Sequence, residues 1–212
     1  MRLKSIVLAA AAMLVMGLIL NGCGNKTTET KTETTAAAVT EANAEAGMKA
    51  PFQENEKAYA EIIDKLPKGQ FYGFADMDEK NDALLVTDET FTNADGKLCA
   101  ANATIYGLDK DGKIIEYGIV ESTSTADPLA TYEGCLMFAG HHHVGMTYID
   151  ESVSSLITKE DASESFDSKG NASYFYFSHD DEFEGEVEDD SKLISLLEKY
   201  EKAVAVRFTE VK

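Results

Sequence analysis

Short turns that carry glycine constrain the fold of this 212-residue chain more than any other feature. One turn, Asp109-Lys110-Asp111-Gly112, is of the Asp-Gly kind, and a second, Glu133-Gly134, again places glycine where the backbone needs a positive φ. Turns this short join antiparallel neighbours only, because parallel strands need a long crossover. Each turn lies between two segments with strand patterning: Ala103 to Leu108 and Lys113 to Val120, and Leu129 to Tyr132 and Cys135 to Ala139. The sequence therefore predicts an antiparallel meander of hairpins.

Helices are predicted only near the two ends of this meander. Apolar residues at three- and four-residue spacing predict a helix from about Glu54 to Leu66. A second helix is predicted from Ser191 to Tyr200, followed by a closing strand from Val204 to Phe208. Further strands are predicted at residues 71–75, 84–87, 142–149, 155–158 and 173–178. The predicted class is α+β, mainly β, with an N-terminal helix and a C-terminal helix plus strand.

The first 23 residues have the pattern of an export signal. Arg2 and Lys4 precede an apolar run from Ile6 to Leu20, whose fifteen residues fall short of the roughly 20 that span a bilayer. The segment that follows, Leu20-Asn21-Gly22-Cys23, resembles the lipobox of bacterial lipoproteins. This resemblance implies a signal peptide at residues 1–22, cleavage before Cys23 and a lipid on its thiol. It also implies that the protein is anchored at the extracytoplasmic face of the cell membrane.

Residues 23–47 have the composition of a disordered tether. They are rich in Thr, Ala and Glu and contain no aromatic residue, so they bury too little apolar surface to offset the entropy of ordering. A flexible segment of this length has an r.m.s. reach of about 25–30 Å. The first 47 residues hold four basic and four acidic side chains, so the formal charge of −19 falls on residues 48–212, a single acidic β-rich domain. Such a charge repels nucleic acid and anionic membranes, so no nucleic-acid partner is predicted.

The segment Phe-Tyr-Gly-Phe-Ala-Asp-Met-Asp-Glu-Lys-Asn-Asp-Ala-Leu-Leu-Val, residues 71–86, resembles the strand–loop–strand unit of FG-GAP and VCBS-type repeats. It is most similar to degenerate copies in uncharacterised lipoproteins of gut-type Gram-positive bacteria. The resemblance implies a calcium loop, because calcium prefers carboxylate oxygens at alternating positions. Asp76 and Asp78 stand at the first two ligand positions, and Asp82 offers a further oxygen. Lys80 stands at the third position and adds a positive charge, so the alternative is a solvated turn without metal.

Three of the four histidines stand together at His141-His142-His143. In a strand, His141 and His143 would point to one face and His142 to the other. This pair offers two imidazole ligands for zinc, and His179, which precedes two aspartates, is the candidate for a third. The alternative is a polar strand or loop rim exposed to solvent.

Once Cys23 carries a lipid, Cys99 and Cys135 are the remaining thiols. Export makes a disulfide between them an option, because structural disulfides persist in oxidising compartments. The apolar surroundings of Cys135 favour the alternative, a buried free thiol that packs as a small apolar side chain.

The stretch His179 to Asp190 holds eight carboxylates. Nothing fixes two of them at a separation suited to acid–base catalysis, so the stretch is typical of a solvated loop. The sequence also lacks a Gly-x-Ser-x-Gly elbow, a Cys-x-x-Cys pair, a phosphate-binding loop and a dinucleotide fingerprint. The aromatic residues of Ser173 to Ser178 fit core packing first, with an exposed stripe for sugar or peptide binding as the alternative.

Together these patterns predict a non-enzymatic protein, held at the membrane by the lipid on Cys23, that binds an unknown envelope protein or small ligand. The main alternative is a metal-binding envelope protein or metal-dependent enzyme that uses His141, His143 and His179. A third hypothesis is a structural accessory that spaces envelope components. No resident cofactor is predicted, and calcium and zinc are the two candidates for a bound ion.

Overall fold

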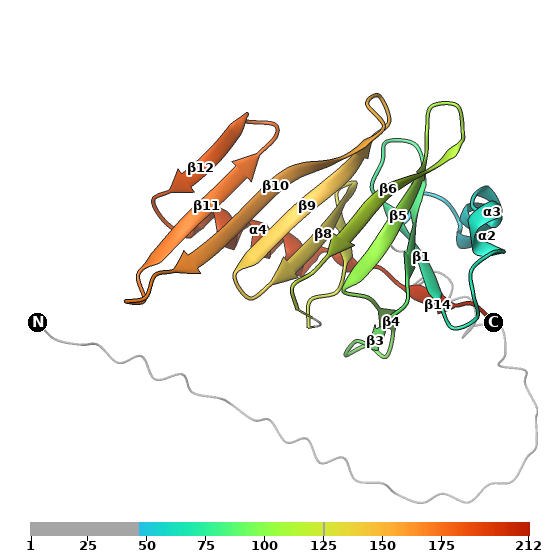
Figure 1. The fold of residues 1–212 in the computed structure, drawn as a ribbon, viewed down its shortest axis with the longest axis horizontal. Coiled ribbons are helices and arrows are strands. Elements are labelled where there is room, and N and C mark those ends of the chain that lie inside the picture. The colour runs from blue at the N-terminus through green and yellow to red at the C-terminus, as the bar shows by residue number, and fades with distance from the viewer. Residues whose placement is uncertain (1–46, 125) are drawn as a thin grey trace, which may run out of the picture.

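The computed structural model describes residues 47–124 and 126–212 (Figure 1). The predicted signal peptide at 1–22, the lipidated Cys23 and the tether up to residue 46 lie outside the described residues. Within those ranges, no helix is both long and apolar enough to cross a membrane.

The predicted mainly β, antiparallel class is confirmed by two sheets whose strands all pair antiparallel. The strands of the five-stranded sheet are, in spatial order, β14 (Phe208–Glu210), β1 (Phe71–Asp76), β2 (Asp82–Thr87), β5 (Asn102–Leu108) and β6 (Ile114–Glu121). Those of the seven-stranded sheet are β12 (Phe183–Val187), β11 (Ala172–Ser178), β10 (Ser155–Phe166), β9 (His143–Asp150), β8 (Cys135–Gly140), β7 (Ala130–Tyr132) and β13 (Val204–Ala205). A small hairpin of β3 (Phe91–Thr92) and β4 (Leu98–Cys99) completes the strands.

The two turns that carried the prediction form as expected. Glu133 and Gly134, with φ of 46° and 74°, join β7 to β8 in the doubly left-handed conformation that a two-residue hairpin requires. At the other turn, which joins β5 to β6, Gly112 has a φ of 78° and the Asp109 carboxylate accepts N–H bonds from Asp111 and Lys113, each at 2.9 Å.

Within the described ranges, three helices accompany the sheets: α2 (Phe52–Ala58), α3 (Ala60–Ile63) and α4 (Ser191–Lys202). The first two replace the single predicted helix, because the backbone at Tyr59 leaves the helical region at φ −109° and ψ 17°. Tyr59 is fully buried there, and its hydroxyl donates to the carbonyl of Asp82 at 2.7 Å. The break therefore lets one aromatic side chain reach a backbone acceptor inside the fold.

Other boundaries differ from the prediction in three places. β10 continues to Phe166 instead of ending near residue 158, because it pairs along its length with β9 and β11. Part of the acidic stretch predicted as a loop forms β12. The predicted closing strand is divided, since β13 joins the seven-stranded sheet and β14 the five-stranded sheet.

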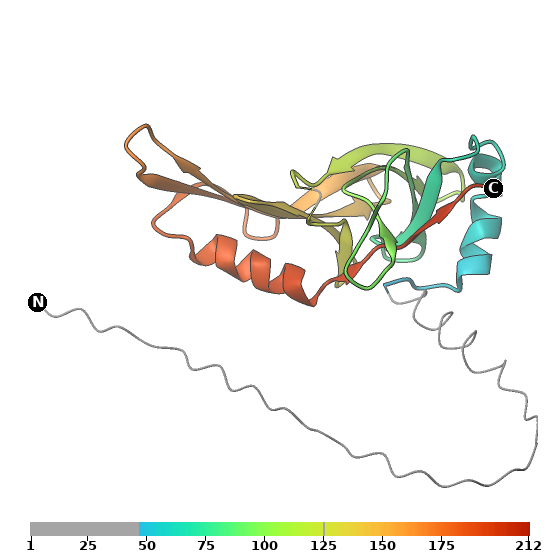
Figure 2. The ribbon, with the colours of Figure 1, turned by 90° about the horizontal axis from the view of Figure 1, so that it is seen from below.

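One apolar core lies between the two sheets. It combines Leu85, Ile105 and Val120 of the five-stranded sheet with Leu136 and Ile149 of the seven-stranded sheet. The five-stranded sheet covers only one half of its longer partner, and α4 packs on the opposite face (Figure 2). As a result β10, β11 and β12 extend beyond the five-stranded sheet.

Candidate functional site

The loop between β1 and β2, residues 77–81, meets the end of β9 where the two sheets join. Met77 is fully buried, and its carbonyl accepts the N–H of Ile149 at 2.7 Å. This backbone bond holds the predicted calcium loop against the turn that links β9 to β10. Asp78 in that loop and the two aspartates that flank it, Asp76 and Asp82, therefore stand at the sheet junction, and each has a different partner.

Asp82 is fully buried and serves as an anchor for the start of the described chain. Its carboxylate accepts the N–H groups of Lys49 at 2.7 Å and Ala50 at 2.8 Å, and the side-chain amide of Asn55 at 2.8 Å. Both oxygens are thus used by donors, which satisfies a buried charge without a metal.

Lys49 supplies the positive charge that a metal would have brought to the loop. Its ammonium lies 2.8 Å from the Asp76 carboxylate and also bonds to the carbonyl of Asp78. A lysine of the same chain therefore neutralises the entrance of the loop.

The third aspartate, Asp78, has one oxygen engaged and one without a partner. Oδ1 accepts the N–H groups of Lys80 at 2.6 Å and Asn81 at 2.5 Å, whereas the buried Oδ2 has no hydrogen-bond partner within the described structure. Burial raises the pKa of this carboxyl and nearby Glu151 adds to the effect, while the two backbone N–H groups and Lys49 oppose it.

The loop does not form the cage that the resemblance implied. In the part of the chain that the structure describes, no three His, Cys, Asp or Glu side chains come together to hold a metal ion. Asp76, Asp78 and Asp82 are directed at a lysine, the loop backbone and the N-terminal segment respectively. This geometry replaces the expected calcium site with an internal ion pair and hydrogen bonds.

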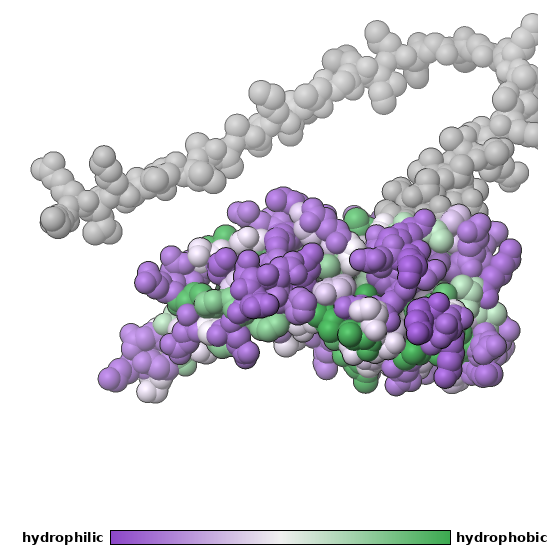
Figure 3. All heavy atoms as spheres, turned by 90° about the horizontal axis from the view of Figure 1, so that it is seen from above, coloured by the Kyte–Doolittle hydropathy of each residue, from purple (hydrophilic) through white to green (hydrophobic). Residues whose placement is uncertain are grey.

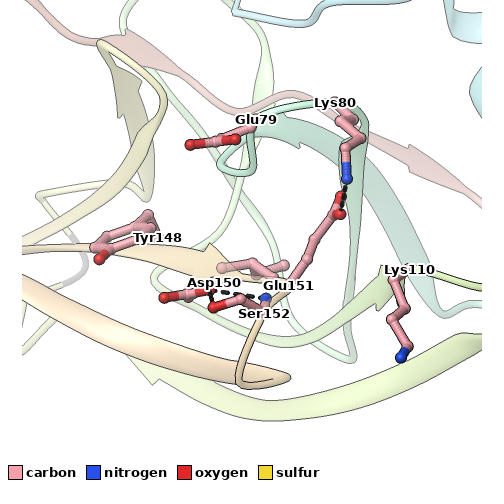
Figure 4. A pocket seen from close by; sticks show the side chains of 8 residues that line it. Glu79, Lys80, Lys110, Tyr148, Asp150, Glu151 and Ser152 are labelled. Carbon is pink, nitrogen blue, oxygen red and sulfur yellow. Dashed lines mark hydrogen bonds and ion pairs between the residues drawn. The ribbon is translucent and has the colours of Figure 1, made fainter.

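Two adjoining cavities lie beside this loop, and together we name them the junction cleft. The first has a volume of about 500 Å³ and is lined by Glu79, Lys80, Lys110, Tyr148, Glu151 and Ser152, among others (Figure 4). The second, of about 380 Å³, shares Glu79 and Tyr148 with it and adds Lys49, Asp78, Lys159 and Asp180. The two lining sets draw on the β1–β2 loop, the β5–β6 and β7–β8 turns, β9 and the turn after it, β10 and the turn after β11.

Charges in the first cavity fall into a paired and an unpaired set. Lys80 and Glu151 form an ion pair, drawn as a dashed line in Figure 4. Glu79 and Lys110, on the walls of the same cavity, form no ion pair with any residue that the structure describes. The first cavity therefore carries a carboxylate at Glu79 and an ammonium at Lys110 that are free of ion pairs.

Two more buried polar atoms near the cleft lack partners within the described ranges: Glu151 Oε1 and the hydroxyl of Tyr117. Burial raises the pKa of Tyr117, and the carboxylates of Asp109, Asp78 and Glu151 raise it further. Sequence patterns had no means of finding this cluster, because Asp78, Tyr117 and Glu151 come from three separate hairpins.

The bulge in β10 also shapes the cleft. The register of β10 against β9 shifts between Thr158 and Glu160, so Lys159 is the extra residue. A bulge redirects the side chain at its centre, and here Lys159 lines the second cavity, 4.0 Å from Asp180.

The histidines do not assemble into the predicted zinc site. His143 Nε2 bonds to Asp161 Oδ2 at 2.7 Å, and His142 Nδ1 to Glu164 Oε1 at 2.7 Å, so each pairs with a carboxylate on β10. His141 lies in the turn before β9 and is exposed. His179 packs against Tyr148, which lies five residues beyond His143 on β9, roughly 16 Å along the strand. His179 is therefore too far away to complete a metal site with His141 and His143.

Cys99 and Cys135 are free buried thiols, so the disulfide considered from the sequence is absent from the structure. Cys135 packs in the apolar cluster beneath α4, and Cys99 belongs to the small β3–β4 hairpin. Burial raises the pKa of both thiols. Each behaves as a small apolar side chain in its own part of the core.

Comparison with known proteins adds no relative: no family model matches the chain, and no curated protein or solved structure is similar to it. The resemblance to FG-GAP and VCBS-type repeats and to Gram-positive lipoproteins therefore stays a prediction.

Replacing Asp82 with Asn tests the anchoring role of this carboxylate. Asp82→Asn turns one acceptor into an N–H₂ donor that faces N–H groups, so we expect a loss of about 1–3 kcal/mol in the free energy of unfolding, measured by urea titration. The matched control is Asp88→Asn, because Asp88 is exposed and its amide counterpart still accepts from Gln70. Equal losses in both variants would show that Asp82 is not an anchor.

The His143–Asp161 pair predicts a pH dependence of stability. The hydrogen bond to Asp161 raises the pKa of His143 above its ordinary value of 6.5, and burial opposes this only in part. Protonated His143 therefore stabilises the fold fully at pH values below the pKa of this imidazole in the unfolded chain. The contribution is lost as the pH rises through the pKa of His143 in the folded protein.

We expect the stability advantage of the native chain over His143→Gln to shrink between about pH 5.5 and pH 8 in urea unfolding. In Asp161→Asn, the NMR titration of His143 should move to lower pH, because its partner is gone. A stability difference that is constant across this range contradicts the assignment.

Proposed function

We propose that this protein is a lipid-anchored extracytoplasmic binding protein whose junction cleft takes a small zwitterionic ligand without transforming it. The observation that carries the proposal is the free pair of opposite charges, Glu79 and Lys110, on the walls of one cavity of about 500 Å³. A ligand with an ammonium group at one end and a carboxylate at the other satisfies both walls at once.

The buried oxygens near the cleft favour the same ligand chemistry. Asp78 Oδ2 and Glu151 Oε1 leave the wall formed by the loop and the β9–β10 turn short of hydrogen-bond donors. A ligand that carries N–H or O–H groups lowers the cost of such unpartnered acceptors, whereas a purely anionic ligand raises it. The ring of Tyr148, on β9 between the two cavities, offers an apolar surface beside these charges.

Binding fits the cleft better than catalysis does. Ser152 is the aliphatic hydroxyl residue among those that line the first cavity, and its hydroxyl donates to Asp150 Oδ1 at 2.6 Å while its N–H donates to the same oxygen at 2.8 Å. These two bonds close the turn between β9 and β10, so the hydroxyl has a structural partner. This supports the non-enzymatic hypothesis over the enzymatic one.

Calorimetric titration of the full-length protein in detergent with glycylglycine tests the ligand class. We expect the dipeptide to bind, and both its N-acetylated and its C-amidated forms to bind about tenfold more weakly, because each lacks one of the two charges. Glu79→Gln should remove the preference for a free amino group, and Lys110→Met the preference for a free carboxylate.

The control variant for this titration is Glu54→Gln, which removes an exposed charge on α2 away from the cleft. It should bind the dipeptide as the native chain does. The absence of heat at millimolar dipeptide, or equal binding of the blocked forms, contradicts the proposal.

The anchor has its own test in cells. The resemblance of Leu20-Asn21-Gly22-Cys23 to a lipobox supports lipidation of Cys23. In Cys23→Ser we expect the protein to leave the membrane fraction or to retain its signal peptide, as seen by fractionation and gel mobility. A variant that stays in the membrane fraction at the mature size contradicts lipid anchoring through this residue.

A further inference from the structure

The seven-stranded sheet ends in β12, a strand with a neighbour on one side only. We propose that this free edge takes up an extended segment of another protein as an added strand, and that this segment alternates basic and apolar residues. The inference concerns a part of the fold away from the junction cleft and does not depend on the ligand proposed there.

The two faces of β12 differ in chemistry, because successive side chains of a strand point to opposite sides. Phe183, Gly185 and Val187 share the face that α4 covers: the ring of Phe183 lies 5.9 Å from that of Tyr176, and Val187 packs against the cluster that contains Tyr176 and Leu196. Glu184 and Glu186 share the other face.

The face with Glu184 and Glu186 is open. Opposite these residues on β11 stand Phe177 and Phe175, and Phe175 is 38% exposed. The five-stranded sheet ends before it reaches these strands (Figure 2), and apolar side chains lie exposed among hydrophilic ones at this end of the molecule (Figure 3). On the other face, Phe183 is 39% exposed at the edge itself.

This alternation defines the complementary strand. In an added strand, the residues beside Phe183 and Val187 would contact partly exposed apolar side chains. The residues beside Glu184 and Glu186 would face carboxylates. Main-chain hydrogen bonds to the free edge hold such a segment, while its alternate side chains select it. A segment in which apolar residues alternate with basic residues is therefore complementary to both faces of β12.

The charge of the edge disfavours pairing of two copies of this chain through their β12 strands. Eight carboxylates and no lysine or arginine stand between residues 180 and 190. Two such edges side by side would place like charges opposite one another, which destabilises a sheet, and charged edge strands are a common defence against self-pairing. The same carboxylates attract a cationic segment.

The nearest lysines do not neutralise the carboxylates of Glu184 and Glu186. Lys192 lies over the ring of Tyr176, 4.6 Å from its centroid and on the helix side, and Lys159 is 4.0 Å from Asp180. Neither Glu184 nor Glu186 forms an ion pair or a side-chain hydrogen bond within the described residues. Both carboxylates are exposed and free to receive a partner.

Binding of a nine-residue peptide that alternates valine and lysine tests the inference. With the full-length protein in detergent, fluorescence anisotropy should detect binding that weakens as salt is added. Hydrogen exchange at residues 183–187 should slow when the peptide is present, because the free edge gains main-chain partners. A peptide of the same composition with all lysines in one block should bind about tenfold more weakly, since its charges and apolar groups no longer alternate.

Paired variants distinguish the edge from a general effect of net charge. Glu184→Gln combined with Glu186→Gln should weaken binding about tenfold. The matched control, Glu198→Gln combined with Glu201→Gln, removes two charges from exposed positions on α4 and should stay within about twofold.

Three results overturn the inference. One is equal binding of the alternating and the block peptide, and a second is equal weakening by the two pairs of variants. The third is a concentration-dependent dimer that protects residues 183–187 without peptide, because the occupant is then a second copy of the chain.

Discussion

The structure depends on the passage of the C-terminal segment from one sheet to the other. Val204 and Ala205 pair with β7, and Phe208 to Glu210 pair with β1. Between them, the N–H of Val206 bonds to the carbonyl of Leu129 at 2.9 Å, and Val206 is buried in the shared core. The same segment therefore lies at an edge of both sheets and ties them together.

Lys49 provides the positive charge that balances the acidic loop at that junction. An acidic hairpin loop needs a counter-charge, and a bound ion supplies one only at sufficient concentration. Here the ammonium is part of the chain, so the counter-charge of the loop comes from Lys49 itself. Glu79, at the exposed tip of the same loop, then faces the cleft as a free carboxylate.

The sequence predicted those features that short-range chemistry determines. The turns at Gly112 and Gly134 were found because few residues accept a positive φ, and α4 because its apolar residues recur at helical spacing. β12 was missed because two glutamates and a glycine conceal the alternation of Phe183 and Val187. The candidate site was also missed, since the bond between Met77 and Ile149 joins residues with no local signal for each other. The ligands expected at Asp82 and His143 proved to have partners on other elements.

Lys49 and Asp82 also give the domain a mechanical property. The carbonyl of Gly47 accepts the N–H of Asp76 at 2.9 Å, and the next residues are bound to Asp82 through Lys49 and Ala50. Any tension applied through the preceding chain therefore enters the fold at the loop end of the β1–β2 hairpin, at the pair Asp76 and Asp82. That hairpin carries the loop that walls the cleft, so the point of load and the wall of the cleft are neighbours along the chain.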